Sequence, residues 1–460
     1  MIDKDFLLQK IWGSWTGKIA GGTFGMPVEG RRRNYITTLQ PPLSGWSKHH
    51  KQAINDDEQY ELISILALEA LDDEEFAERL EAGTLLEPDY LGPYWLKYLL
   101  PQYVFTAEKA AYENAKNGVP WEHAGDYVYE HEGKVFGNEF ADWIGAQMKG
   151  ELYGMLLPAW GWYDATKENR NSKDDLKLLK PCLDLSLQDA LIAHREVGIV
   201  GELFISAMIA VAIVHNQYEC NEELNFPESE ITKWVPDPNN PKGFKKEGQK
   251  FEGFSQQIHQ VGICSETIIN DIKRIEAVLL DFASVVDSIS VEDVQLYFSF
   301  INPIIIDFIE KPDSRDWESV WLTINIRWWE FEGDMIKNAI TDLKDYPTIL
   351  EKRLQSIRYS KKAHTLFNNS AIVVGLLYGD GDFMQTVRIS TEVGCDTDCN
   401  AGNAGAILGA YLGQDLIPSY AKRFIRGEII PGLKEWKDKS LLNLSQRTFA
   451  QALRFEPLKN

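Results

Sequence analysis

Two aspartates stand one residue apart in the stretch Gly394-Cys395-Asp396-Thr397-Asp398-Cys399-Asn400-Ala401-Gly402. The stretch begins and ends with glycine, and small residues continue through Asn403–Gly413, which we predict to be a helix. Short acidic turns of this kind bind hard divalent cations, because several oxygen ligands must converge on one point. The stretch therefore predicts a metal-binding turn at the start of a closely packed helix.

The first alternative for this stretch is an EF-hand calcium loop. Three oxygen ligands stand at the required spacing, but Ala401 takes the place of the obligatory glycine and Ile407 that of the closing glutamate. The EF-hand interpretation therefore fails. The second alternative is that Asp396 and Asp398 cap the following helix, which is the commoner role of a lone acidic residue before a helix. The residues by themselves leave capping and metal binding open.

A second acidic cluster, Asn55-Asp56-Asp57-Glu58, lies far upstream and precedes an apolar helical stripe. If folding brings the two clusters together, they form a carboxylate-rich pocket whose like charges repel one another. Magnesium neutralises such a pocket and keeps coordination positions open for water or substrate oxygens. A pair of ions would orient a diol or activate water, whereas Cys399 is a soft ligand that suits magnesium poorly. Glu29 is a candidate further carboxylate, although for a lone glutamate an exposed surface position is the commoner interpretation.

Helical periodicity dominates the chain and strand-like alternation is scarce, so we predict an all-α fold. The apolar run Ile199–Val214 contains Glu202 and is short for a bilayer span, so we expect a buried helix there and no membrane contact. Two segments carry glycine at every fourth residue: Gly13, Gly17, Gly21 and Gly25 in the first, and Gly405, Gly409 and Gly413 in the second. Residues four apart share one helix face, so each stripe lets another backbone approach closely. We expect these glycines to serve packing rather than ligand binding.

Length and composition are those of a globular protein, with 460 residues, 44% hydrophobic and 25% charged. We treat residues 1–460 as one domain with a polar, proline-rich surface excursion at about 216–254 and a charged loop at Lys167–Lys177. A net charge of −22 repels a nucleic-acid backbone, so no nucleic-acid partner is expected. The five cysteines form no CxxC pair, and Met1–Asp5 does not begin a signal peptide, so we expect a cytoplasmic protein.

Three segments resemble the signatures of the ADP-ribosylglycohydrolase family, in the family's order: Gly17–Glu29, Asn55–Gln59 and Gly394–Gly413. Further likeness covers most of the chain outside the excursion and runs through Ile144–Lys149, Asp189–His194, Asn368–Ala371 and Tyr378–Phe383. The resemblance implies a compact, orthogonally packed all-α fold with a centre of two Mg²⁺ ions, Mn²⁺ or Ca²⁺ being the alternatives. It also implies hydrolysis of an N- or O-glycosidic bond at the anomeric carbon of an ADP-ribosyl group.

The same resemblance implies a set of metal ligands, namely Asn55, Asp56, Asp57, Asp396, Asp398 and Cys399. In this set, Asn55 and Cys399 stand where the family usually has ligating threonines. Glu58 also replaces a threonine, and Gly22 stands where an aspartate is common. These departures leave the number and preference of the metals open.

Catalytic and substrate-binding residues follow from the resemblance as well. Glu29 matches the glutamate that the family uses near the scissile bond, and Asp57 and Asp396 complete the expected catalytic set. The expected substrate-binding residues are Gly145, Gln147 and His194, although a lone histidine is more often a satisfied core residue. The alternatives are a hydrolase of free nucleosides or related ribosyl metabolites and a non-catalytic ADP-ribose-binding protein.

Overall fold

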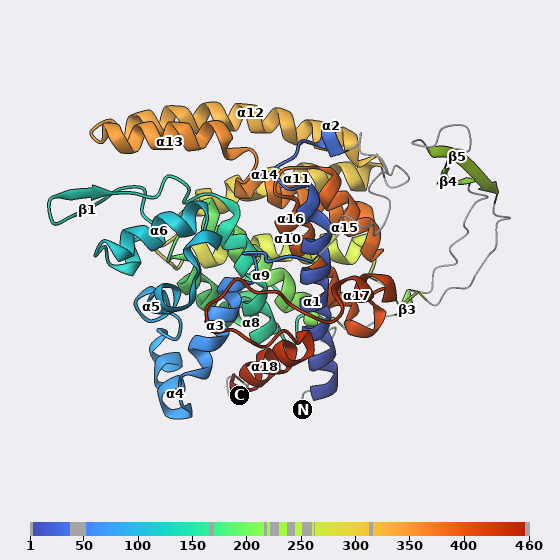
Figure 1. Cartoon of the computed structure of the whole chain (residues 1–460), viewed down its shortest axis with the longest axis horizontal. Helices are drawn as coiled ribbons and strands as arrows, with labels where there is room; N and C mark the ends of the chain where they lie inside the picture. Colours follow the sequence, from blue (N-terminus) through green and yellow to red (C-terminus); the bar gives the residue numbers. More distant parts are fainter. Residues whose placement is uncertain are drawn as a thin grey trace.

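The computed structural model describes residues 3–36, 52–164, 170–215, 219–220, 230–236, 244–250, 260–261, 263–311 and 316–455. Apart from three short strands, the surface excursion predicted at about 216–254 lies outside the described residues. The described part is dominated by helices, which confirms the all-α prediction (Figure 1).

The α-helices, in chain order, are α1 (Lys4–Gly25), α2 (Arg33–Ile36), α3 (Gln59–Glu69), α4 (Asp73–Ala82), α5 (Pro88–Tyr98), α6 (Thr106–Lys116), α7 (Glu151–Leu156), α8 (Ser172–Ala190), α9 (Val197–Ile213), α10 (Ser265–Ala283), α11 (Val291–Glu310), α12 (Trp317–Asp342), α13 (Pro347–Ser360), α14 (Thr365–Gly379), α15 (Phe383–Glu392), α16 (Thr397–Leu412), α17 (Ser419–Ile425) and α18 (Leu441–Arg454). Short 3₁₀ turns are η1 (Met26–Val28), η2 (Pro101–Tyr103), η3 (Trp121–His123), η4 (Ile144–Lys149) and η5 (Gln414–Leu416). The strands form antiparallel pairs: β1 (Tyr129–His131) with β2 (Lys134–Phe136), β3 (Glu219–Cys220) with β6 (Gln260–Val261), and β4 (Glu230–Pro236) with β5 (Phe244–Lys250).

The two predicted glycine stripes pack against each other and join α1 to α16 (Figure 1). A methyl group added at Gly17 would lie 1.9 Å from the carbonyl oxygen of Gly405, and one added at Gly25 would lie 2.0 Å from that of Thr397. Only glycine allows this approach, because any side chain would overlap the opposite backbone. The helices run antiparallel, and the seam carries the N-terminus of α16 to the C-terminal end of α1.

Helix α16 begins at Thr397, six residues before the predicted start at Asn403. Asp398 therefore lies in the first helical turn rather than in the preceding loop. Cysteine, asparagine and aspartate are weak helix formers, but every residue of α16 is buried, so packing against α1 overrides their propensity.

The charged loop predicted at Lys167–Lys177 is wrong from Ser172 onward, where α8 begins; residues 165–169 lie outside the described part. The Asn171 side chain caps this helix by accepting from the backbone N–H groups of Lys173 and Asp174. Acidic residues in the first turn suit the positive end of the helix dipole. The charges mark a helix start rather than a solvated loop.

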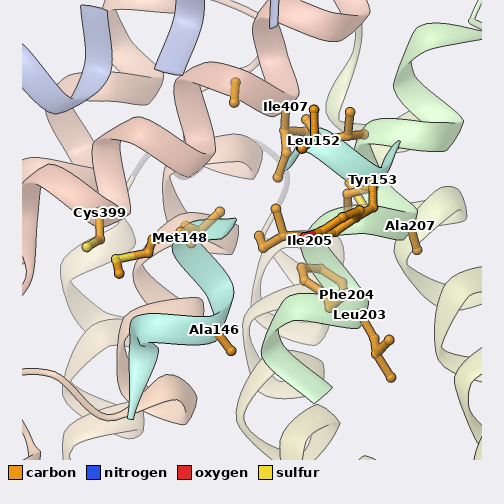
Figure 2. Close-up of a cluster of buried hydrophobic side chains, with 14 of the residues drawn as sticks. Ala146, Met148, Leu152, Tyr153, Leu203, Phe204, Ile205, Ala207, Cys399 and Ile407 are labelled. Atoms are coloured by element: carbon orange, nitrogen blue, oxygen red, sulfur yellow. The ribbon is translucent and has the colours of Figure 1, made fainter. Parts of the chain in front are cut away.

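Helix α9 forms the centre of the core, and every residue from Val197 to Ile213 is buried, as predicted for this apolar run. Figure 2 shows Phe204 and Ile205 of α9 among side chains from η4, α7 and α16. Cys399 lies at the edge of this cluster, near Met148. Within the described ranges, no helix combines the length and apolarity needed to cross a membrane.

Candidate metal centre

A cavity of about 480 Å³ lies between the segment that follows α1, the turn before α3, η4 and the N-terminus of α16. All six predicted metal ligands line it: Asn55, Asp56, Asp57, Asp396, Asp398 and Cys399. Glu29 and Gly145, predicted for catalysis and substrate binding, line it as well. The structure therefore brings the two acidic clusters into one cavity.

The turn before α16 takes its shape from two successive residues in the left-handed region. Gly394 has φ +87° and Cys395 has φ +70°. The backbone of Cys395 accepts from the N–H of Gly30 at 2.8 Å and donates to the carbonyl of Arg31 at 2.9 Å. These bonds tie the acidic turn to the segment that carries Glu29.

Asn368 of α14 fixes the acidic turn from the other side. Its Oδ1 atom accepts from the backbone N–H of Asp396 at 3.2 Å and from Nδ2 of Asn400 at 2.9 Å. Asp396 occupies the N-cap position of α16, but its side chain accepts no capping hydrogen bond from this helix. The capping alternative therefore fails for Asp396, whose carboxylate faces the cavity.

Asn55 is held against Asp57 in the turn before α3. Its Nδ2 atom donates to Oδ2 of Asp57 at 3.2 Å, and its Oδ1 atom accepts from the Asp57 N–H at 3.3 Å. A methyl group added at Gly22 would lie 3.3 Å from Nδ2 of Asn55. The space beside Gly22 is therefore shared with the Asn55 amide.

Cys399 joins the two clusters directly, because its Sγ atom donates to Oδ1 of Asp57 at 3.1 Å across 342 residues of sequence. The ligand atoms of Asp396, Asp398 and Cys399 all lie within 4.8 Å of one another. Oδ1 of Asp398 is buried and has no hydrogen-bond partner among the described residues. An unpaired carboxylate oxygen beside two further ligand atoms fits a divalent cation.

Burial and mutual repulsion disfavour ionisation of the cavity acids. Burial raises the pKa of Asp398 well above its ordinary value, and the charges of Asp57 and Asp396 raise it further. Burial and then Asp57 raise the pKa of Asp396 to about 7. Burial also raises the pKa values of Asp56 and Asp57. The arrangement is therefore costly unless protons or cations neutralise it.

A lysine in the first glycine stripe balances a different set of acids beneath the cavity. Nζ of Lys18 donates to Glu61 at 2.6 Å, to Glu151 at 3.1 Å and to the carbonyl of Met148 at 2.6 Å. Glu151 also accepts from Nδ2 of Asn403 at 2.5 Å. These buried residues were not singled out from sequence, although a lysine within a glycine-lined buried helix is a signal for an internal ion pair.

Gln147 and His194 lie behind the cavity and do not line it. Gln147 is buried and donates through Nε2 to Oδ1 of Asn403 at 3.3 Å. His194 is buried and accepts at Nε2 from the backbone N–H of Ala146 at 3.1 Å, and burial lowers its pKa well below the ordinary value. Both residues hold the η4 segment in place, so their substrate-binding roles stay a prediction.

Glu108 is a cavity residue that the sequence did not indicate. A methyl group added at Gly145 would lie 2.1 Å from Oε1 of Glu108, so the glycine lets this carboxylate lie against the η4 backbone. Burial raises the pKa of Glu108 to about 7, against the lowering effect of Lys149. Glu29 lines the cavity where it opens to solvent, and partial burial by the surrounding walls and then the charge of Asp57 raise its pKa.

Comparison with known proteins gives one family. The sequence profile described as ADP-ribosylglycohydrolase matches residues 3–271 and 314–451. No curated protein matches the chain significantly. A solved structure described as an ADP-ribosylglycohydrolase-related protein complex aligns over 99% of this chain and 100% of its own, at 13% identity and a TM-score of 0.42. Because the family profile covers most of the chain, this protein belongs to the ADP-ribosylglycohydrolase family.

Proposed function

We propose that this protein is a metal-dependent hydrolase that cleaves an N- or O-glycosidic bond at the ribose of an ADP-ribosyl group. The family match supports the glycohydrolase type of function and the class of substrate. The observation that carries the proposal is the meeting of Asp56 and Asp57 with Asp396 and Asp398 in one cavity. A volume of about 480 Å³ lies in the range of small-molecule sites.

The cavity acids are hard oxygen donors, which suits Mg²⁺ first and Mn²⁺ or Ca²⁺ as alternatives. The residues that would hold two such ions are Asn55, Asp56, Asp57, Asp396, Asp398 and Cys399. Bound ions supply positive charge for ribose hydroxyls and lower the pKa of water. Oδ1 of Asn55 already accepts a hydrogen bond from the Asp57 N–H, so it is the least available of these ligand atoms for a metal ion.

Glu29 is placed to handle the proton of the leaving group. It lines the same cavity as the aspartates but is exposed to solvent, and burial and the charge of Asp57 raise its pKa, which favours its protonated form. A carboxylic acid with such a pKa protonates a departing oxygen or nitrogen. Asp57 and Asp396, which line the same cavity, would orient the attacking water.

The remaining walls are suited to a planar substituent. Phe105 lines the cavity with 49% of its surface exposed, and Tyr103 lies beside the same opening. Exposed aromatic rings offer flat, apolar surface on which a base stacks. The buried side chains of Ile144 and Met148 exclude water deeper in, which strengthens electrostatic interactions with the substrate.

The test is release of ADP-ribose from an ADP-ribosylated protein in the presence of Mg²⁺ and of EDTA. We expect release only with the metal and its loss in Asp398→Ala, whereas the exposed control Asp415→Ala keeps full activity. Ribose release from free nucleosides in place of ADP-ribose release would move the substrate to small ribosyl metabolites.

A non-catalytic binding role is the second candidate, because the side chains of Asn55 and Cys399 are both engaged by Asp57 rather than free. Tight binding of ADP-ribose without turnover under Mg²⁺, Mn²⁺ or Ca²⁺ would establish that role and overturn the hydrolase proposal.

A further inference from the structure

The outer face of α12 carries a stripe of exposed apolar side chains. Leu322, Ile326, Trp329 and Ile340 are 63%, 59%, 71% and 50% exposed. Gly333 and the half-buried Ile336 complete the stripe, so that its members are spaced alternately by four and three residues. This is the spacing of a coiled-coil seam. The opposite face of α12 is already packed into the core through Trp321, Ile324 and Trp328.

The positions of the stripe are arranged symmetrically along the sequence about position 331. If a second copy of α12 lay antiparallel across it, Leu322 would meet the partner subunit's Ile340. Ile326 would meet the partner subunit's Ile336, and Trp329 would meet the partner subunit's Gly333. Each exposed apolar side chain then faces another member of the stripe on the second copy. Both copies contribute the same patch, as a two-fold interface requires.

The central layer fits by shape as well as by chemistry. Apart from the backbone of α12 itself and the two chain neighbours, nothing lies within 4 Å of a methyl group placed at Gly333, so the missing side chain leaves an open hollow in the stripe. A large indole at the neighbouring stripe position, Trp329, would fill the matching hollow beside the partner subunit's Gly333. Large and small residues facing each other in this way form a knob and a hole.

We propose that α12 pairs with α12 of a second copy of this chain to form an antiparallel, two-fold symmetric dimer. If fully covered, the four exposed side chains of two copies bury on the order of 1,000 Å² together, which is the size of a weak, reversible interface. Figure 1 shows α12 along the outer edge of the molecule, far from α18 and both chain ends.

The same geometry brings like charges together at the axis. Glu330 faces the partner subunit's Glu330, and each copy carries a net charge of −22. Salt screens such repulsion. The dimer therefore tightens as salt rises from low to physiological ionic strength, and Glu330→Gln tightens it at low salt.

The test is sedimentation of the full chain over a range of concentrations, with circular dichroism to confirm folding. We expect a monomer–dimer equilibrium that weakens at least tenfold in Trp329→Glu and in Gly333→Leu, which fills the hollow. Val285 is equally exposed but lies outside α12, so Val285→Glu is the matched control and keeps the wild-type equilibrium. A wild-type monomer at every concentration, or a Trp329→Glu dimer of unchanged affinity, overturns the proposal.

Cross-linking tests the antiparallel direction. Glu330 lies beside the two-fold axis, whereas Lys337 lies near an end of the stripe. A short bismaleimide therefore links the Glu330→Cys variant into a covalent dimer through the two introduced cysteines and leaves the Lys337→Cys variant unlinked. The wild type shows how much cross-linking the native cysteines give. Equal linking of both variants would mean a parallel pairing and overturn the assignment.

Discussion

Two groups of buried carboxylates lie next to each other in this molecule and are neutralised differently. Beneath the cavity, Lys18 pairs with Glu61 and Glu151, while Lys149 pairs with Asp189 at 2.9 Å. In the cavity, none of the four aspartates has a lysine or arginine in direct ion-pair contact within the described ranges, although the charge of Lys18 acts on Asp57 from a distance and opposes the rise of its pKa. The inner group contains two lysines among its four carboxylates, Glu61, Glu151, Asp189 and Glu202. The cavity group contains no cation of its own among the described residues and needs protons or cations from outside.

This difference separates a structural role from a functional one. Buried charges with a permanent partner hold elements together, and removing one partner leaves the other uncompensated. Buried like charges without a partner cost stability and persist where function requires them. Substitution of Lys18 should therefore lower the free energy of unfolding, whereas substitution of Asp398 in the absence of metal should raise it.

Lys18→Met tests the inner group and carries the largest expected effect. It leaves Glu61 and Glu151 buried without their cation, so we expect the free energy of unfolding to fall by about 3–5 kcal/mol. Urea denaturation measures this change. The exposed Lys352→Met should stay within about 0.5 kcal/mol of wild type. A loss for Lys18→Met as small as that of the control would break the comparison.

Asp398→Asn tests the cavity group. It removes one of several repelling charges at an atom that has no internal partner, so in EDTA we expect a gain of about 1–2 kcal/mol. The same variant should lose most of the Mg²⁺-induced rise in melting temperature, which differential scanning fluorimetry records. The exposed Asp415→Asn controls for charge alone. Lower stability of Asp398→Asn in EDTA would place Asp398 with the structural acids.

The acidic residues that line the cavity were predictable from sequence because they stand in short local patterns. Asp56 and Asp57 are adjacent, and Asp396 and Asp398 are one residue apart. The glycine stripes also predicted close backbone packing, which the α1–α16 seam confirms. This seam sets the register that brings Thr397 beside Gly25 and so aims the acidic turn at the cavity.

Other features depend on contacts that no local pattern encodes. Glu108 reaches the cavity only because Gly145, far along the chain, leaves room for its carboxylate. His194 points into the protein because the Ala146 N–H needs an acceptor there. The start of α16 was misplaced because its burial, not its helix propensity, decides where it begins.

Measuring stability as a function of pH distinguishes the cavity carboxylates from the inner carboxylates. The pKa of Asp396 is raised from 3.8 to about 7, so the folded protein binds more protons than the unfolded chain between these values. In EDTA this group therefore costs stability progressively as pH rises from about 4 to about 7. Mg²⁺ competes with the proton, so its affinity should rise about tenfold, or about 1.4 kcal/mol, from pH 6 to pH 8.

The quantity to measure is the difference in unfolding free energy between Mg²⁺ and EDTA at each pH. Taking this difference cancels the contributions of titrating groups outside the cavity. Asp142 is one such group, because Arg353 and His364 lower its pKa despite its burial. Asp396→Asn should flatten the pH dependence of the difference, whereas Lys352→Met should leave it unchanged. A difference that is constant from pH 6 to pH 8 in wild type would argue against a proton-linked metal at this site.

Cys399→Ser carries the smallest effect on magnesium and the most selective one on metal preference. The serine hydroxyl keeps the hydrogen bond to Oδ1 of Asp57 but offers a hard ligand in place of a soft one. By calorimetry we expect Cd²⁺ affinity to fall about tenfold or more while Mg²⁺ affinity changes by less than about threefold. Cys264→Ser, at a half-buried cysteine away from the cavity, is the matched control. If Cd²⁺ binds both proteins equally, the Cys399 sulfur lines the cavity only as a hydrogen-bond donor to Asp57, and the external cation rests on the carboxylates alone.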